Sequence, residues 1–390
     1  MNNQQINWVN FLHLYLPPTA EKEIIDETVN KSYNWILSMA EKYPAWHFTI
    51  NITGCLTEAL DKYGYQNILN RIKKLIYNGQ IELVDSLSHH PIAPLISDHI
   101  VRRQITQQQI INKKYFNNEA KGFFLPEMAY DKKTGQLLSD LGYKWILLDE
   151  IHLAGKLDKV NWQTKYVIKN NNLKVIFRSR EWSHNYPPKT ILQNIKSKKI
   201  PNFLITATDA ELYGHRFVDW EGWLGKTLEL TQVHTLTISE YLKLLPNSEP
   251  KYISPITGNW ESLENELTKK FPFSLWQHKL NRLHKKLWEL ARLATSVIEK
   301  NPHDNAYQWA QQHLDRGLAS CTFWWASGRD FKLFGAPAWH PDEVEKGALE
   351  LVKVIRTINV DKKTKLKAEK IYHKLKYLLW ETHWNNYENK

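Results

Sequence analysis

The sequence is poor in cysteine and contains no long apolar run. Cys55 and Cys321 are the two cysteines among 390 residues. They allow neither a disulfide framework nor a cysteine-rich zinc site, and we expect two buried thiols. No window approaches the roughly eighteen uninterrupted apolar residues of a membrane-spanning helix, so we expect no membrane partner. The first residues carry no basic leader followed by an apolar segment, which favours a cytoplasmic protein.

Positive charge is in excess but is not concentrated. Lysine and arginine outnumber aspartate and glutamate by 52 to 41, for a net charge of +11. The lysines are scattered over many predicted helix surfaces and form no stripe, so we expect no nucleic-acid partner. The 17 tryptophans and 18 tyrosines are the unusual feature. Aromatic faces stack on sugar rings as readily as they fill cores, so part of this set is expected to line a polysaccharide groove.

Short apolar strands alternate with amphipathic helices in the first 230 or so residues, with a hairpin at 164–169 and 173–179 inserted into the repeat. This order favours a mainly parallel sheet with right-handed crossovers. A barrel with fewer than eight strands is the economical architecture, and an open doubly wound sheet is the alternative. The strands are expected at 6–16, 47–52, 81–84, 122–125, 145–148 and 203–207, and the helices at 21–42, 57–78, 98–116, 131–141, 188–198 and 221–231.

The character of the chain changes near Leu275. Apolar residues at helical spacing continue to Val297 with no strand after them, and three more helical stretches follow at 304–320, 341–358 and 362–381. Prolines and polar residues interrupt the periodicity over 247–274, which indicates a linker. We therefore predict a catalytic barrel domain over 1–260 and an all-helical C-terminal domain over 270–390.

Two carboxylates directly follow apolar strands. Glu127 ends the segment 122–127 and Asp209 ends the segment 204–209. The carboxyl ends of parallel barrel strands form one face, so both acids are expected there. Glycoside cleavage requires such a pair, in which one carboxylate attacks the anomeric carbon and the other protonates the leaving oxygen. The alternative is that each acid caps the next helix or pairs with a lysine.

Ionisable and aromatic residues crowd the segment after Asp209. His215 and Arg216 are suited to hydrogen-bond sugar hydroxyls or to tune the neighbouring carboxyl group. Trp220 and Trp223 offer stacking faces for a sugar. Glu211 is expected to orient its neighbours and not to take part in chemistry.

Two adjacent histidines follow the predicted strand at 81–84. We expect His90 to reach sugar hydroxyls and His89 to bind the scaffold. Adjacent side chains usually diverge, so a shared metal ion is disfavoured and we predict neither a metal nor a cofactor. Glu82 lies on the strand itself, where a buried acid is usually paired.

Consecutive tryptophans and a cluster of charges complete the candidates. Trp324 and Trp325 point about 100° apart on a helix, so one of them, which we take as Trp325, is expected to reach the cleft. The alternative is that both pack at the domain interface. Arg178, Arg180 and Glu181 close the predicted hairpin, where surface ion pairs are the default expectation.

Several of these motifs, in this order, resemble glycoside hydrolase family 57. The resemblance implies a distorted, incomplete (β/α)7-type barrel, a helical domain, a retaining mechanism with Glu127 as nucleophile and Asp209 as acid/base, and no metal. It also implies that Glu82 binds or orients the substrate. His13 lacks the second histidine two positions away that the family motif has. The matching segments are Leu12-His13-Leu14, 79–83 with His90-Pro91, 124–127, 209–215, Leu275-Trp276 with Asn281, His284 and Trp288, and 320–325.

The leading interpretation is a retaining glycoside hydrolase or transglycosylase that acts on α-glucans such as starch, glycogen or maltooligosaccharides. One alternative is a metal-dependent polysaccharide deacetylase, in which His13, His89, His90 and Asp209 would converge on one cation. Another is a carbohydrate-binding homologue without turnover. The sequence leaves open hydrolysis or transfer, the linkage of the product and the oligomeric state.

Overall fold

The computed structural model describes residues 5–195, 200–327 and 339–387. The chain divides into two compact units. The first comprises 1–16, 20–88 and 93–267, and the second comprises 17–19, 89–92 and 268–390.

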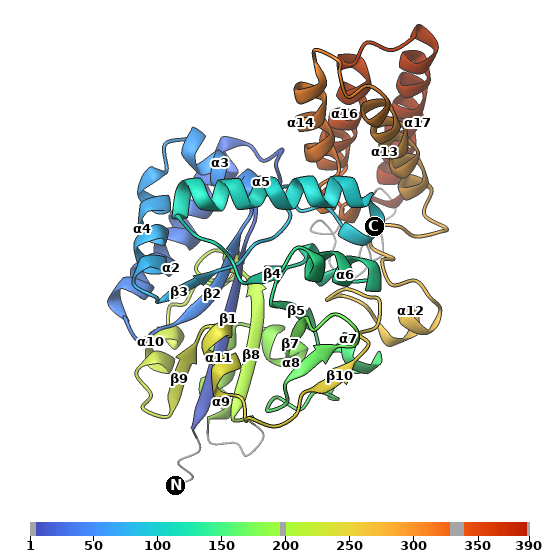
Figure 1. Cartoon of the computed structure of the whole chain (residues 1–390). Coiled ribbons are helices and arrows are strands. Elements are labelled where there is room, and N and C mark those ends of the chain that lie inside the picture. The colour runs from blue at the N-terminus through green and yellow to red at the C-terminus, as the bar shows by residue number, and fades with distance from the viewer. Residues whose placement is uncertain (1–4, 196–199, 328–338, 388–390) are drawn as a thin grey trace. The chain divides into compact units, whose positions relative to one another are not determined.

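The first unit is built on parallel strands. β1 pairs in parallel with β2 and β8, and Figure 1 shows it between them. β1 is buried along almost its whole length, which explains its near-continuous apolar sequence. The strands are β1 (Ile6–Leu14), β2 (Phe48–Ile52), β3 (Ile81–Leu83), β4 (Gly122–Phe124), β5 (Trp145–Asp149), β6 (Tyr166–Ile168), β7 (Lys174–Arg178), β8 (Phe203–Asp209), β9 (Val233–Leu236) and β10 (Lys251–Ile253).

Two junctions close these strands into a ring. Asp85, just after β3, bridges in parallel to Phe123 on β4. Ser179, just after β7, donates its backbone N–H to the carbonyl oxygen of Ile205 on β8 at 2.8 Å. In the part of the chain that the structure describes, the ring therefore runs β1-β2-β3-β4-β5-β7-β8, and its sheet pairings are parallel. This confirms the predicted incomplete barrel.

The predicted hairpin forms, but its second arm is not an insertion. β6 and β7 pair antiparallel, while β7 also pairs in parallel with β5 and so belongs to the ring. Two strands were not predicted. β9 pairs with the first half of β1, and β10 adds to β6 inside the segment expected to be a linker.

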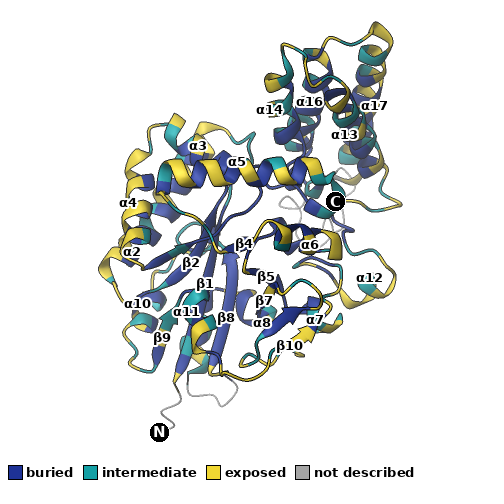
Figure 2. Cartoon of the chain, viewed as in Figure 1, coloured by how far each residue is buried: buried dark blue, intermediate teal, exposed yellow. Residues whose placement is uncertain are grey.

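Helices surround the ring, with exposed outer faces and buried strands (Figure 2). The helix expected over 57–78 is two helices, because Gly64 adopts a left-handed φ of +86° between them. None of the described helices is long and apolar enough to cross a membrane. The helices are α1 (Lys22–Thr28), α2 (Asn34–Lys42), α3 (Gly54–Lys62), α4 (Gln66–Tyr77), α5 (Asp98–Phe116), α6 (Lys132–Asp140), α7 (Ile151–Ala154), α8 (Arg180–Ser183), α9 (Pro187–Asn194), α10 (Trp223–Leu228), α11 (Ile238–Leu244) and α12 (Glu264–Thr268); a π-helical turn, η1 (Val29–Tyr33), joins α1 to α2, and the 3-10 turns are η2 (Ala93–Leu95), η3 (Pro126–Met128) and η4 (Ala210–Leu212).

The second unit is helical, as predicted. The side chain of Asn281 caps α13 by accepting hydrogen bonds from the backbone N–H groups of Leu283 and His284. α14 and α16 pack closely, since a Cβ added to Gly317 would lie 2.6 Å from the side chain of Leu351. The helices are α13 (Arg282–Lys300), α14 (Tyr307–Gly317), α15 (Ser320–Trp324), α16 (Pro341–Thr357) and α17 (Lys362–Tyr387).

Candidate active site

Three polar residues lie side by side at the carboxyl ends of neighbouring ring strands. His13 on β1 is the register partner of Asn51 on β2 and of Asp209 on β8. His13 Nδ1 lies 2.8 Å from Asn51 Oδ1, an acceptor, so Nδ1 carries the proton. Burial lowers the pKa of His13, although the charge of Asp209 and the Asn51 bond oppose this shift. His13 is thus held as a neutral side chain next to an acid.

Glu127 lies just beyond β4 on an unusual backbone. Glu127 and Met128 have φ of 58° and 49°, in the left-handed region. Such a conformation costs on the order of 1–3 kcal/mol in a non-glycine residue and is found where function or packing requires it. Pro126 and Met128 are buried, whereas Glu127 between them is partly exposed. The turn therefore brings Glu127 to the carboxyl end of the ring with part of its surface exposed.

Trp260 fixes the Glu127 carboxylate. Its indole Nε1 donates to Glu127 Oε2 at 2.8 Å, and its backbone N–H donates to the Glu127 carbonyl oxygen at 3.0 Å. The same ring lies edge-on to His13, with 6.3 Å between ring centroids. Because His13 is also the register partner of Asp209, Trp260 and His13 connect the surroundings of the two acids.

A buried ion network supports Trp260. The guanidinium carbon of Arg178 lies 4.8 Å from the Trp260 ring centroid, and its Nη2 donates to the Trp260 carbonyl oxygen at 3.3 Å. Asp149 accepts from Arg178 Nε at 2.8 Å and from Arg180 Nη2 at 2.7 Å. Burial would raise the pKa of Asp149, but the two arginines outweigh it and keep the pKa below its usual value. Asp149 therefore stays ionised and holds Arg178 against Trp260.

The segment after Asp209 adds an ion pair and a buried acid. Arg216 Nη1 donates to Asp209 Oδ2 at 2.8 Å. Glu211 is buried and accepts from the Tyr33 hydroxyl at 2.6 Å. Burial, followed by the charge of Asp209, raises the pKa of Glu211 to about 7. Gly214 has a φ of +87°, and a Cβ there would lie 2.3 Å from the carbonyl oxygen of Lys31, so this loop is packed tightly against η1.

Two other predicted residues of the first unit contact the protein scaffold. His215 Nε2 lies 3.5 Å from Glu27 Oε1, and Glu82 accepts hydrogen bonds from Ser239 and Thr49. Their predicted role in substrate binding stays a prediction.

The two predicted stacking tryptophans differ from each other. Trp223 begins α10 and packs against the core, with the ammonium groups of Lys189 and Lys226 within 6 Å of its ring centroid. Trp220 is 89% exposed. Of the pair, Trp220 is therefore the side chain with a ring face open to a ligand.

His90 and Trp325 belong to the second unit. His90 is buried with a φ of 58°, and its Nδ1 lies 2.9 Å from Ser320 Oγ. Trp325 is half-buried, with its ring centroid 5.8 Å from that of His340. Their contact with a substrate bound at Glu127 and Asp209 stays a prediction.

Sequence reasoning missed the residues that position Glu127. Trp260 falls in the segment expected to be a linker, and its signal was a lone tryptophan in Asn259-Trp260-Glu261, between two stretches without periodicity. The expectation of a surface ion pair at Arg178 was wrong, because this residue is 6% exposed and its side chain is paired with a buried aspartate. Asn51 was missed because it lies inside a strand.

The fold and the site define a parallel (β/α) barrel with acidic side chains at the carboxyl ends of its strands. Residues 2–256 match the family model of glycosyl hydrolase family 57. The chain belongs to this family.

Within the described residues, no group of three or more histidine, cysteine, aspartate or glutamate side chains could hold a metal ion.

Curated relatives are similar over part of their length. An α-amylase of Pyrococcus horikoshii is 23% identical over 67% of this chain and 43% of its own length. A 4-α-glucanotransferase of Thermococcus litoralis is 22% identical over 68% of this chain and 43% of its own length. The chain thus spans less than half the length of these relatives.

Solved structures show the same fold. The 4-α-glucanotransferase of Thermococcus litoralis superposes with a TM-score of 0.71 at 17% identity, covering 92% of this chain and 61% of the other. A branching enzyme from Thermococcus kodakaraensis gives 0.68 at 16% identity, covering 94% of both chains.

Proposed function

We propose that this protein is a retaining glycoside hydrolase or transglycosylase acting on α-glucans, with Glu127 as nucleophile and Asp209 as general acid/base. The observation that carries the proposal is the placement of these two acids at the carboxyl ends of β4 and β8 in one parallel ring. The family supports the reaction class. The amylase, glucanotransferase and branching-enzyme names of its relatives support an α-glucan substrate.

In the first step the Glu127 carboxylate attacks the anomeric carbon. The bond from that carbon to the leaving oxygen breaks, and Asp209 transfers its proton to this oxygen. A glycosyl ester on Glu127 results. The Trp260 N–H holds one Glu127 oxygen in place during this attack.

In the second step Asp209 takes a proton from water or from a sugar hydroxyl, and the resulting oxygen attacks the anomeric carbon. The ester bond to Glu127 breaks and the carboxylate is restored. The Trp260 hydrogen bond stabilises the charge that returns to Glu127. Water as acceptor gives hydrolysis, and a sugar hydroxyl gives transfer.

Three further residues are suited to contact the substrate around this pair. His13 lies next to Asp209, Arg216 is ion-paired to it, and Trp220 exposes a ring face. We propose that His13 and Arg216 hydrogen-bond sugar hydroxyls and that Trp220 stacks on a glucan chain.

The two acids have different roles, so their variants are expected to differ. Asp209→Asn keeps the nucleophile but loses the proton donor and base. With an aryl maltoside, whose leaving group needs little protonation, we expect a glycosyl-enzyme to accumulate and to appear as a mass increase on the peptide that contains Glu127. Glu127→Gln cannot form this ester. Loss of turnover on maltoheptaose in both variants, with an adduct only in Asp209→Asn, is the expected pattern.

The proposal would be wrong if Glu127→Gln kept near-full activity on maltoheptaose or formed the same adduct. Circular dichroism on both variants checks that the fold is retained. Chromatography of the wild-type products separates the two reaction types, because products longer than maltoheptaose require transfer.

A further inference from the structure

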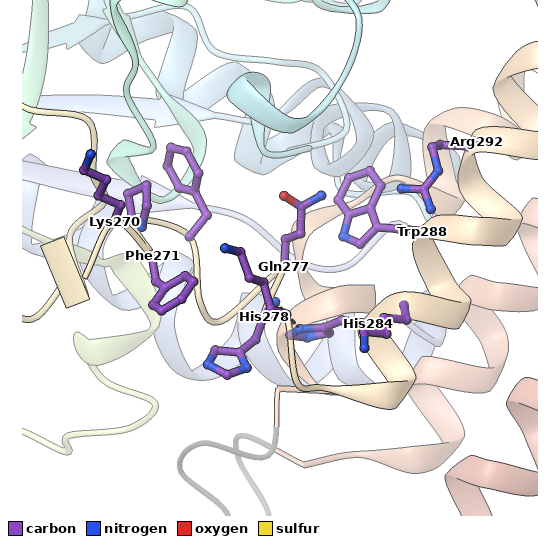
Figure 3. Close-up of a pocket in the computed structure, with 11 residues that line it drawn as sticks. Lys270, Phe271, Gln277, His278, His284, Trp288 and Arg292 are labelled. Atoms are coloured by element: carbon purple, nitrogen blue, oxygen red, sulfur yellow. Dashed lines mark hydrogen bonds between the residues drawn. The ribbon is translucent and has the colours of Figure 1, made fainter. Parts of the chain in front are cut away.

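The second unit contains a cavity of its own, just ahead of helix α13. Its volume is about 340 Å³, at the small end of the roughly 300–1,000 Å³ range of ligand sites. In the view of Figure 3, Lys270 and Phe271 lie on one side, and Trp288 and Arg292 on the other. The lining residues all lie between 270 and 292, so the cavity does not depend on how the two units are placed.

The charge around this cavity has one sign. In the described part of the chain, no acidic side chain lines the cavity. Its four cationic side chains are Lys270, Lys279, Lys285 and Arg292. Among the described residues, none of these four is within ion-pair distance of a carboxylate. Other lysines of the same unit are paired, such as Lys286 with Glu289 at 2.5 Å and Lys353 with Glu350 at 2.6 Å. The cavity therefore concentrates positive charge that the protein does not neutralise, which favours an anion.

One wall of the cavity is rigid and aromatic. Trp288 is stacked on Phe323, with 4.4 Å between ring centroids, and its Nε1 donates to the Trp276 carbonyl oxygen at 2.9 Å. Phe271 is half-buried on the opposite side, and the Lys279 ammonium lies 5.0 Å from its ring centroid. Such apolar ring surfaces suit the apolar face of a sugar.

Two histidines of the lining are hydrogen-bonded to the backbone. His284 Nδ1 accepts from the backbone N–H of His278 at 3.0 Å, and its Nε2 donates to the Phe323 carbonyl oxygen at 3.0 Å. Burial lowers the pKa of His284 to about 4, so the ring is neutral at neutral pH. His278 Nδ1 accepts from the backbone N–H of Leu280 at 3.2 Å, which leaves its Nε2–H as a donor in the lining.

We propose that this cavity binds a phosphorylated hexose, with the phosphate monoester held by lysines of the lining and the sugar ring between Phe271 and Trp288. The size of the cavity fits one sugar ring with its phosphate. This site goes beyond the proposed function, because it uses neither Glu127 nor Asp209. The same chemistry occurs in a free hexose phosphate and in a phosphorylated glucose unit of a glucan.

Isothermal titration calorimetry of the full-length protein tests the proposal with three probes: glucose 6-phosphate, inorganic phosphate and glucose. We expect saturable binding of glucose 6-phosphate that is at least tenfold tighter than that of either other probe and that weakens with added salt. The double variant Lys279→Glu/Lys285→Glu should weaken this binding by at least tenfold. The matched control, Lys300→Glu/Lys367→Glu, changes the net charge equally at exposed positions outside the lining and should stay within twofold of wild type.

Three outcomes would overturn the proposal: no saturation with glucose 6-phosphate, inorganic phosphate binding as tightly, or equal weakening in the control. A competition arm separates the sources, because displacement by a phosphorylated maltooligosaccharide, and not by its dephosphorylated form, identifies the glucan-bound ester. Absence of displacement identifies the free hexose phosphate. Binding is measured without turnover and is expected to be unchanged in Glu127→Gln, so its failure and a failure of the proposed catalysis are separate results.

Discussion

Replacing Trp260 by phenylalanine tests whether the indole N–H sets the reactivity of Glu127. The substitution keeps an aromatic ring next to His13 and Arg178 but removes the donor that lies 2.8 Å from Glu127 Oε2. The backbone hydrogen bond from residue 260 to the Glu127 carbonyl oxygen is retained. The variant therefore isolates one hydrogen bond to a carboxylate.

The size of the effect follows from the type of bond. A hydrogen bond to a charged group contributes about 1.5–3 kcal/mol. The bond holds the Glu127 carboxylate during the attack and stabilises the charge that returns to it when the ester breaks. Most of the bond energy should therefore appear in the activation barrier, where about 1.4 kcal/mol corresponds to a factor of ten in rate. We therefore expect kcat on maltoheptaose to fall by about 10- to 150-fold, with little change in KM.

Steady-state kinetics of Trp260→Phe and of a matched variant, Trp309→Phe, measure this effect. Trp309 is 63% exposed on α14, so the same chemical change there should leave kcat within twofold. Trp260→Phe combined with Glu127→Gln should lose no more activity than Glu127→Gln alone, because the bond acts only through that carboxylate. A kcat for Trp260→Phe within twofold of wild type would refute the reasoning.

Four further outcomes are expected. Asp149→Asn leaves Arg178 and Arg180 without their buried counter-charge and should destabilise the fold by about 3–5 kcal/mol in urea unfolding. The pKa of Glu211 rises from 4.5 to about 7 on folding, so the stability of the wild-type protein falls as pH rises through this window. Glu211→Gln should therefore be more stable than wild type at pH 8, by roughly 3 kcal/mol, and should lose this advantage below pH 5. Gly214→Ala, which also meets a backbone oxygen, should cost more unfolding free energy than Gly222→Ala, where φ is +68° but no atom lies within 4 Å. Treatment with EDTA should leave turnover on maltoheptaose unchanged, since the proposed chemistry uses two carboxylates, and a loss restored by added metal would contradict it.

The ring and its acidic residues were predictable because they follow from local patterns. A buried parallel strand is a short apolar run, and the polar residue that ends it lies at the carboxyl edge whatever the rest of the chain does. Glu127 and Asp209 end such runs, and His13 stands near the end of β1. β9 was missed because four residues, of which only Val233 is buried, give too weak a pattern.

The support of the site was not predictable, because it depends on contacts between segments far apart in sequence. Trp260 is 133 positions from Glu127, and their hydrogen bond forms because residues around 258 pair with Tyr130 in an isolated bridge. Arg178 follows an apolar run, and this pattern does not distinguish a buried arginine from an exposed one. Only the pairing of β5 with β7 places Asp149 opposite Arg178 and makes this arginine a buried partner.

The register of the strands gives the two acids their different surroundings. Asp209 is part of a row of residues across β8, β1 and β2, in which its neighbour is His13. It also forms an ion pair with Arg216, which lies on the loop after Asp209. Glu127 instead lies on a left-handed turn and is held by a neutral N–H donor. A nucleophile needs one fixed orientation, whereas an acid/base must exchange a proton in both steps and so needs access. Trp260 fixes Glu127, while Asp209 keeps a partly exposed side chain, and this arrangement fits the division of roles. The double variant Glu127→Asp/Asp209→Glu, which exchanges the two acids, should therefore be inactive on maltoheptaose.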